Sequence, residues 1–466
     1  MYSAIQERAA VEIDLDLLRK YDRPGPRYTS YPPAPRFAAD YGAPAFRADV
    51  AASDLERRPL SLYVHLPFCH ARCFFCGCNV EITRNRERIE QYLGYLEREL
   101  DLVAALVSPG RPVEQLHWGG GTPTYLSPRE IRRLAAAIHA RFDLAPNAEV
   151  SVEIDPRGIE QDHLSALRDG GFSRASVGVQ DFDPRVQQAI HREQPYELTR
   201  WAVDSLRKLG FTSVNLDLIY GLPLQTEESF ARTLDTVLTL TPDRLAVFSY
   251  AHVPWVKRNQ QAIDAGELPS GETKLRMLRR TIEVLERAGY AHIGMDHFAK
   301  PDDELTRAQR EGTLRRNFQG YSTRGGTDLL AFGVTGISSL AGSYAQNVKE
   351  LPAYYQRIDA GELPTERGYR LTPDDRLRRH VIHELMCNLR LDVAALEAET
   401  GIDFAGYFSA SLLQLRELEQ DGLVRREPRS IAVTRLGRLF VRNIAMSFDA
   451  YLATQVPGGP LFSRTV

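Results

Sequence analysis

Outside one short segment the chain of 466 residues has almost no cysteine. Four of its five cysteines lie within residues 69–78, and Cys387 stands alone. Cysteines distributed so unevenly cannot supply a disulfide framework for the whole chain. Thiols grouped this tightly are typical of metal ligands in a reducing compartment. The scarcity of cysteine elsewhere therefore indicates one metal centre in one segment.

Long apolar runs and excess charge are also lacking. No stretch approaches the roughly 18 to 20 apolar residues of a membrane-spanning helix. The first twenty residues carry Glu7, Glu12, Asp14 and Asp16 and no apolar run, unlike a secretion signal. A net charge of −3 gives no general attraction to nucleic acid or to a membrane surface. We therefore expect a cytoplasmic globular protein of two or three domains that binds neither of these partners.

The cysteine segment has the spacing C-x3-C-x2-C, with one more cysteine two residues later. A structural zinc ion takes four nitrogen or sulfur ligands, usually from two separated pairs. The chain has no second pair, although His65, His70 or Cys78 would complete a set. A 4Fe–4S cluster takes thiolates from a tight loop, and three of them leave one iron open to a substrate or cofactor. The segment alone leaves both metals open.

Strand and helix patterns alternate from about residue 61 onward. Buried strand-like runs such as residues 214–219 are separated by segments with apolar residues at helical spacing. Repeated strand–helix units predict a parallel sheet with helical crossovers. Six or more units favour an α/β fold with a partial or full (β/α) TIM-like barrel. We expect strands at 62–66, 113–118, 149–154, 174–179, 213–220, 244–250 and 291–296, and helices at 85–107, 127–142, 161–168, 196–209, 226–240 and 271–288.

Polar and glycine-rich residues follow these strands at their C-terminal ends. In folds of this kind, sites form at that edge of the sheet. The residues there are the cysteine segment, Gly119, Gly120, Gly121, Thr122, Glu153, Asp155, Gln180, Asp217, Ala251 and His252. We therefore expect them on one face of one sheet.

The two flanks differ from the barrel. Residues 1–57 are predicted to be a mostly irregular N-terminal arm that covers the active site, with a short helix before Tyr21. Residues 58–355 are predicted to form the catalytic barrel, and residues 365–466 a mostly α-helical, winged-helix-like C-terminal domain. Arginines in this last domain are compatible with nucleic-acid binding. Without aromatic interleaving or a basic run elsewhere, we favour a lid or packing domain.

Several motifs together resemble a known family. The cysteine segment is similar to the signature of radical S-adenosylmethionine (SAM) enzymes. The wider pattern resembles the oxygen-independent coproporphyrinogen III oxidases from about Tyr21 to the end of the chain, with no departure at the motif positions. The motifs are GPRYTSYP at 25–32, YVHLPFC at 63–69, HWGGGTPT at 117–124, GVQDF at 178–182, DLIYGLP at 217–223 and GMDHFA at 294–299.

The resemblance implies a cofactor and an oxidoreductase reaction of haem biosynthesis. Cys69, Cys73 and Cys76 would hold a 4Fe–4S cluster, and SAM would chelate the open iron. Reductive cleavage of SAM would give a 5′-deoxyadenosyl radical, which takes hydrogen from the β-carbon of a substrate propionate. Loss of CO2 and one electron would leave a vinyl group. Two rounds would convert coproporphyrinogen III to protoporphyrinogen IX, with a flavodoxin- or ferredoxin-type protein as a reducing electron donor.

The resemblance also implies two SAM positions. The residues implied for the first SAM are Tyr63, Gly120, Glu153 and Ile337, and those for the second are Phe75, Gly121, Thr122, Gln180, Arg192, Asp217 and Ala251. Gly120 and Gly121 lack a Cβ, so backbone can approach a ligand closely, and a guanidinium suits a carboxylate. Simpler interpretations stay open: the glycines as a plain turn, Glu153 as a solvated acid, and Arg192 with Asp217 as a structural ion pair.

Two residues at the site are candidate catalytic groups. His65 is either a core histidine or faces the substrate. Cys78 either packs beside the cluster or takes part in electron or proton transfer. Trp118 and Cys387, in contrast, are expected in the hydrophobic core.

The partners implied by the resemblance are the porphyrinogen and the electron donor, and we expect a monomer. The porphyrinogen carries four carboxylates, for which Arg27, Arg315 and Arg316 are candidate partners. One alternative within the superfamily is a haem-binding or haem-chaperone protein without oxidase activity. An alternative of a different class is a zinc-stabilised nucleic-acid-binding protein.

Overall fold

The computed structural model describes residues 14–452 and 462–465. The chain forms two compact units, which are described separately. The barrel unit comprises Pro35–Pro269 and Gly326–Leu371, and the helical unit comprises Met1–Ala34, Ser270–Gly325 and Thr372–Val466. Each unit is therefore assembled from segments that lie far apart in the sequence.

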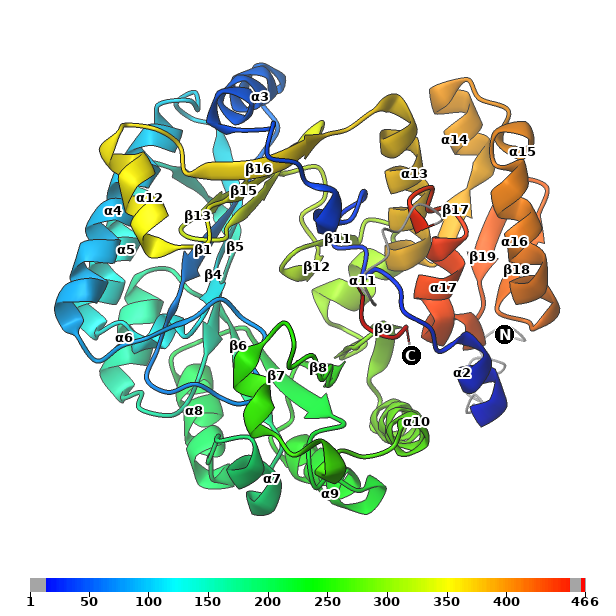
Figure 1. Ribbon diagram of the computed structural model, residues 1–466, viewed down its shortest axis with the longest axis horizontal. Coiled ribbons are helices and arrows are strands. Elements are labelled where there is room, and N and C mark those ends of the chain that lie inside the picture. Colours follow the sequence, from blue (N-terminus) through cyan, green and yellow to red (C-terminus); the bar gives the residue numbers. More distant parts are fainter. Residues whose placement is uncertain (1–13, 453–461, 466) are drawn as a thin grey trace. The chain divides into compact units, whose positions relative to one another are not determined.

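A largely parallel sheet forms the centre of the barrel unit (Figure 1). Neighbouring strands run parallel from β13 through β1 to β8. In spatial order they are β13 (Asp328–Phe332), β1 (Leu60–Leu66), β4 (Pro112–Gly120), β5 (Asp143–Ile154), β6 (Arg174–Gln180), β7 (Ser213–Tyr220) and β8 (Arg244–Ser249). Beyond β13, the antiparallel strands β14 (Ile337–Ser339), β15 (Ser343–Asn347) and β16 (Thr365–Arg370) extend the sheet.

Helices connect the parallel strands and lie along the outside of the sheet (Figure 1). They are α4 (Arg86–Ala104), α5 (Pro128–His139), α6 (Gln161–Asp169), α7 (Pro184–Ala189), α8 (Tyr196–Lys208) and α9 (Glu227–Thr239). A capping box starts α5: the Glu130 N–H donates to the Ser127 hydroxyl, and the Ser127 N–H donates to the Glu130 carboxylate. Among the helices of the described residues, none has the length and apolar character needed to cross a membrane.

The two faces of the strands differ, and this difference decides where a polar site can form. In β7, Val214, Leu216 and Leu218 are fully buried, whereas the alternating Asn215 and Asp217 are partly accessible. Successive side chains of a strand point to opposite faces. Apolar side chains thus meet the surrounding helices, and the polar side chains of β7 point to the inner face of the sheet.

The helical unit contains helices and several short strands. Its elements include α2 (Leu15–Tyr21), α10 (Gly271–Arg287), α11 (Glu304–Arg310), α13 (Pro373–His383) and α17 (Val441–Met446), with hairpins of β9 (Ala291–Gly294) with β10 (His297–Ala299) and of β11 (Arg315–Asn317) with β12 (Gly320–Ser322). A sheet of β17 (Arg390–Asp392), β19 (Ser430–Val433) and β18 (Val424–Glu427) accompanies α14 (Val393–Thr400) and α16 (Ser409–Gln420). Helices beside a small antiparallel hairpin are the winged-helix-like arrangement that the sequence predicts.

Three segments differ from the sequence-based prediction. Residues 43–56, expected in an irregular arm, form α3 (Ala43–Glu56), which buries Phe46 and Val50. The strand β13 was not predicted, because it is short and directly follows a glycine-rich turn. The strand expected at 291–296 is wrong in its second half: the chain turns at Met295, whose φ is +50°, and returns as β10.

Candidate active site

The cysteine segment follows β1 and is held by its backbone. At its base, β2 (Phe68–Cys69) pairs with β3 (Glu81–Ile82). The side-chain amide of Asn259 donates to three carbonyls of the segment at 2.9–3.3 Å, and that of Gln260 donates to a fourth at 3.0 Å. These carbonyls belong to Cys73, Phe74, Cys76 and Phe75. The backbone is thus fixed without using the sulfur atoms.

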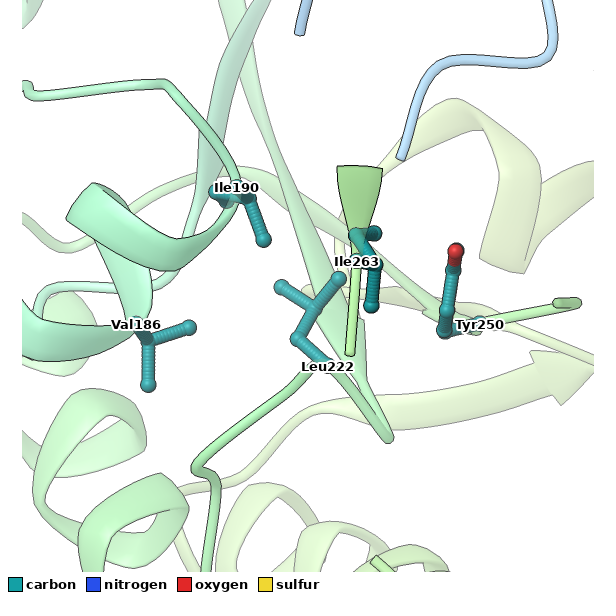
Figure 2. Close-up of a cluster of buried hydrophobic side chains, with 5 residues drawn as sticks. All are labelled: Val186, Ile190, Leu222, Tyr250 and Ile263. Atoms are coloured by element: carbon teal, nitrogen blue, oxygen red, sulfur yellow. The ribbon is translucent and has the colours of Figure 1, made fainter. Parts of the chain in front are cut away.

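Two aromatic side chains anchor the same segment. Figure 2 shows the buried apolar cluster of Val186, Ile190, Leu222, Tyr250 and Ile263. Phe74 and Phe75 pack against this cluster. The ring of Phe74 also stacks on His191, with the centroids 5.0 Å apart. Because aromatic rings bury large apolar areas, this packing holds the segment against the barrel.

The sulfurs of Cys69 and Cys76 contact neutral groups. Cys69 Sγ lies 3.3 Å from the Thr122 hydroxyl oxygen, and Cys76 Sγ accepts a hydrogen bond from the Cys78 N–H at 3.4 Å. Burial raises the pKa of the Cys69 thiol to about 12. At neutral pH this sulfur therefore ionises only when a cation displaces its proton. The Cys76 thiol differs, because hydrogen bonds from Cys78 lower its pKa to about 6.

The third sulfur belongs to a charged cluster, which we call the Asp155 cluster: Asp155, Arg157, Arg192 and Cys73. Arg157 and Arg192 donate to one oxygen of Asp155 at 2.7 and 2.9 Å. They also donate to Cys73 Sγ at 3.4 and 3.7 Å. Burial alone would raise the pKa of Asp155, but the two guanidiniums lower it by a larger amount, so it lies below its usual value. Two cations thus face one carboxylate and one sulfur that a metal would ionise.

The glycines at the end of β4 allow close contact with protein groups. An added Cβ would lie 2.9 Å from the Glu153 carboxylate at Gly119 and 2.7 Å from the His65 ring at Gly120, where φ is +117°. At Gly121 it would lie 2.7 Å from backbone atoms just before the cysteine segment. At Gly121 the neighbours are backbone atoms, at Gly120 the φ is one that other residues rarely adopt, and at Gly119 a side chain would displace the Glu153 carboxylate. The glycines are therefore more than a plain turn.

Glu153 is placed as a hydrogen-bond acceptor beside β4. Its carboxylate accepts from the Gly120 N–H at 3.2 Å and lies 3.5 Å from His117 Nε2. Burial alone would raise the pKa of Glu153, but His117 and the Gly120 amide lower it by a larger amount, so it lies below its usual value. The ring of Tyr63 stacks on that of His117, with the centroids 5.9 Å apart. An ionised carboxylate on β5 and an aromatic hydroxyl on β1 thus lie on the two strands that flank β4.

His65 is held in one tautomer. Its Nε2 lies 3.1 Å from the carbonyl of Asn79, and its Nδ1 lies 3.1 Å from the Tyr63 hydroxyl. A carbonyl only accepts, so Nε2 carries the proton and Nδ1 accepts from Tyr63. Burial lowers the pKa of His65, which favours the neutral ring. Since both nitrogens are engaged, His65 is better suited to holding Tyr63 than to moving a proton.

Asp217 differs from Asp155 because no arginine pairs with it in the described structure. It accepts from the Ser176 hydroxyl at 2.8 Å and from the Asn215 amide at 2.7 Å. Burial raises its pKa to about 6, and the charge of Glu153 adds to this shift. The structural ion pair between Arg192 and Asp217 is a wrong interpretation, since Arg192 forms its ion pair with Asp155.

The remaining predicted site residues also lie in the barrel unit. Gln180 is the last residue of β6 and has a φ of +69°. A Cβ added at Gly178 would lie 3.0 Å from the Gln180 amide and 3.0 Å from the Arg192 guanidinium, so both groups lie close to this glycine. The carbonyl of Ala251 accepts from Gln260 at 3.3 Å. Ile337 begins β14, which pairs with β13 next to β1. Most of the predicted site thus converges at one edge of the sheet.

Other predicted residues lie away from this site. Trp118 is buried against Phe172, with ring centroids 4.7 Å apart, and Cys387 is fully buried in the helical unit. Their predicted core positions are confirmed. The candidate substrate partners Arg27, Arg315 and Arg316 all belong to the helical unit.

Known proteins resemble this chain over nearly its full length. Residues 63–237 match the radical SAM superfamily, and residues 371–440 match the HemN C-terminal domain. The oxygen-independent coproporphyrinogen III oxidase of Escherichia coli (strain K12) is 52% identical over 442 residues, which are 95% of this chain and 96% of that protein. The chain belongs to the oxygen-independent coproporphyrinogen III oxidase family.

Further relatives and a solved structure agree with this membership. The oxygen-independent coproporphyrinogen III oxidase of Synechocystis (strain PCC 6803) is 46% identical over 460 residues, 98% of each chain. A solved structure from Escherichia coli, described as coproporphyrinogen III oxidase (HemN) and a radical SAM enzyme, superposes with a TM-score of 0.91 at 50% identity. It covers 95% of this chain and 100% of the other. The resemblance and the barrel fold predicted from the sequence are confirmed.

The cysteine segment suits the iron–sulfur cluster that radical SAM enzymes of this family require. Its three sulfurs lie on one fixed loop, and the guanidiniums at Cys73 would offset the negative charge of thiolates. In the part of the chain that the structure describes, no three His, Cys, Asp or Glu side chains are grouped to hold a single metal ion.

Three residues of the site were missed by sequence reasoning. Arg157, Asn259 and Gln260 fix the cysteine segment, yet no motif marks them. Asn259 and Gln260 lie in the long connection after β8, where spacing gives no information about contacts. Asp155 carried a partial signal, because it directly follows the end of β5.

Proposed function

We propose that this protein catalyses the oxygen-independent oxidative decarboxylation of coproporphyrinogen III to protoporphyrinogen IX. One observation carries the proposal. This chain, which is related to the family over nearly its whole length, presents three cysteines on one fixed loop beside the glycine-rich end of β4. Two propionate side chains of the substrate lose CO2 and become vinyl groups.

The residues that hold the cofactors are part of the proposal. Cys69, Cys73 and Cys76 ligate a 4Fe–4S cluster. Together with SAM, the cluster supplies the 5′-deoxyadenosyl radical that removes hydrogen from the substrate. The first SAM is bound by Tyr63, Gly120, Glu153 and Ile337, and the second by Phe75, Gly121, Thr122, Gln180, Arg192, Asp217 and Ala251.

The chain's own groups bind and orient these cofactors. Glu153, ionised beside His117, accepts hydrogen bonds from the ammonium or hydroxyl groups of the first SAM. Arg192 offers its Nε, a buried atom to which the described residues give no hydrogen-bond partner. Phe74 and Phe75 exclude water from one side of the cysteine segment. His65, whose tautomer is fixed, holds the Tyr63 hydroxyl in place.

The partners and the organisation of the chain complete the proposal. A flavodoxin- or ferredoxin-type protein supplies electrons, since a 4Fe–4S centre accepts them singly. The enzyme acts as a cytoplasmic monomer. For the organisation of the chain we keep the division expected from the sequence: an N-terminal arm of residues 1–57 that covers the active site, a catalytic domain of residues 58–355 and a helical lid domain of residues 365–466.

Product analysis after anaerobic turnover tests the function. Reconstituted protein with coproporphyrinogen III, SAM and a reductant is expected to form protoporphyrinogen IX, CO2 and 5′-deoxyadenosine. The matched control omits SAM. Haem binding without any loss of CO2 would instead identify a haem-handling member of the superfamily and would refute the oxidase function.

A further inference from the structure

An arginine with no partner for its terminal nitrogens lies inside the helical unit. Arg316 is the central residue of β11 and is only 5% exposed. Its guanidinium lies over the ring of Tyr321, 4.8 Å from the centroid, and its Nε donates to the carbonyl of Arg27 at 3.2 Å. Among the described residues neither Nη has a hydrogen-bond partner, and Nη1 is completely buried.

The surroundings of Arg316 carry an excess of positive charge. We call Arg27, Arg316, Arg442 and Asp296 the Arg316 cluster. Arg27 forms an ion pair with Asp296. Arg442 is buried, and its nitrogens donate to backbone carbonyls, among them that of Pro26 at 3.0 Å. Three guanidiniums therefore face one carboxylate, and two of them, those of Arg316 and Arg442, are buried.

Such an imbalance is costly unless a ligand corrects it. A buried donor without a partner loses its hydration and gains nothing in return. Burial lowers the pKa of Arg442 to about 9 and also lowers that of Arg316, and in both cases the charge of Arg27 adds to the shift. These arginines thus repel one another. An incoming anion would supply both the missing charge and the missing acceptors.

The fork of the guanidinium indicates which anion fits. Two terminal nitrogens of one arginine match the two oxygens of a carboxylate in a bidentate pair. The Arg316 side chain is held in place by the Tyr321 ring and by its Nε contact, so little side-chain entropy is lost when such a pair forms. Arg315, its neighbour, is already paired with Glu384 at 3.1 Å.

We propose that Arg316, supported by Arg27, binds a propionate carboxylate of the porphyrinogen substrate. This inference rests on the proposed function, because the substrate named there carries propionates on every pyrrole ring. It makes Arg316 a substrate-binding residue and separates it from Arg315, which the sequence ranked equally.

Binding of coproporphyrin III to the reconstituted protein tests the proposal. This stable oxidised form of the substrate keeps all its carboxylates and is fluorescent. Arg316→Gln is expected to weaken coproporphyrin binding about tenfold. Arg316→Lys keeps the charge but cannot form a bidentate pair, so its affinity is expected to lie between those of wild type and Arg316→Gln. The matched control is Arg310→Gln, which removes an exposed arginine of the same unit, and wild-type affinity is expected there.

Two further measurements separate recognition of a carboxylate from a structural role. The tetramethyl ester of coproporphyrin has no charge, so its affinity is expected to be the same in wild type and in Arg316→Gln. In turnover, KM is expected to rise about tenfold in Arg316→Gln, while kcat changes less than about threefold. Cluster content and SAM cleavage without substrate are expected to stay at wild-type level.

Several outcomes would overturn the proposal. Coproporphyrin affinity equal to wild type in Arg316→Gln would do so, and so would an equal loss of affinity for acid and ester. If Arg316→Gln does not fold, two other measurements test the proposal: the affinity of Arg316→Lys for coproporphyrin III, and the affinities of wild type for coproporphyrin III and for its tetramethyl ester. Failure of the inference is distinct from failure of the function. An Arg316-dependent preference for the acid without any protoporphyrinogen formation would keep the carboxylate site and refute the oxidase.

Discussion

The Asp155 cluster and the Arg316 cluster use the same residue types in opposite ways. In the Asp155 cluster, the terminal nitrogens of Arg192 donate to Asp155, Cys73 and the carbonyl of Gly178. In the Arg316 cluster, the described residues give the terminal nitrogens of Arg316 no partner. The first cluster is balanced by a carboxylate and a sulfur that belong to the chain. The Arg316 cluster has fewer anionic groups than guanidiniums, as expected for a site that binds an anionic ligand reversibly.

The pKa values of the acidic residues follow the same distinction. Asp155 lies between two guanidiniums, and its pKa falls below the usual value although burial raises it. Asp217 is buried with a hydroxyl and an amide instead, and its pKa rises to about 6. Loss of solvent contact thus raises the pKa of both carboxylates, and the two arginines reverse this shift at Asp155.

The largest expected effect comes from removing the sulfur of the balanced cluster. Cys73→Ser is expected to lose the iron–sulfur cluster, and with it all product formation, because a neutral hydroxyl replaces a thiolate ligand. Iron content, visible absorbance and 5′-deoxyadenosine release measure this. Cys387→Ala removes a buried thiol of the helical unit and is expected to retain iron. Full iron content in Cys73→Ser would contradict the ligand assignment.

The next effect concerns the carboxylate of the same cluster. Asp155→Asn removes the carboxylate that pairs with Arg157 and Arg192, and breaking a buried ion pair from one side costs about 3 kcal/mol. Thermal unfolding of the reconstituted protein measures the loss. Asp101→Asn breaks the exposed ion pair with Arg141 and is expected to cost less than about 1 kcal/mol. Equal losses in the two variants would show that the Asp155 cluster is not the buried framework described above.

Sequence reasoning found the barrel and the edge where the site forms, because both follow from local patterns. Strand–helix periodicity gave the order of the parallel strands, and the cysteine spacing gave the metal segment. It missed β13, whose pairing with β1 joins residues more than 250 positions apart. The ion pair between Arg192 and Asp155 was not foreseen either, since the sequence offered a pair with Asp217 only as an alternative to SAM binding. Which of several arginines and acids meet depends on tertiary packing, and spacing along one chain does not encode it.

An effect of similar size and opposite sign on the free energy of unfolding is expected from replacing Asp217, which has no arginine partner in the described structure. The pKa of Asp217 is raised from 3.8 to about 6, so the folded protein holds this proton more tightly than the unfolded chain. The associated stability is present below pH 3.8 and is lost as the pH rises through about 6. Asp217→Asn stays neutral, so at pH 7 it is expected to be more stable than wild type by about 3 kcal/mol.

Thermal midpoints between about pH 5 and 8, with reconstituted protein and no SAM, test this prediction. The difference between Asp217→Asn and wild type is expected to grow from about pH 5 to about pH 7 and then to level off, because above the folded pKa of about 6 both states have lost the proton. The control Asp204→Asn changes an exposed acid and is expected to follow the wild-type curve. A constant difference at every pH would mean that Asp217 does not titrate in the folded protein as its burial predicts.

The smallest effect tests the Arg316 cluster by competition. If its excess charge accepts carboxylates, acetate binds there weakly and competes with coproporphyrin III. Raising sodium acetate to about 0.5 M is expected to weaken wild-type porphyrin binding about fivefold, by mass action at the shared site. Sodium chloride at the same ionic strength screens charges equally but cannot form the bidentate pair, so it should weaken binding less. In Arg316→Gln the two salts should act alike. A wild-type protein that responds equally to both salts would mean that general screening, and not a carboxylate site, governs binding, and the contrast between the two clusters would fail.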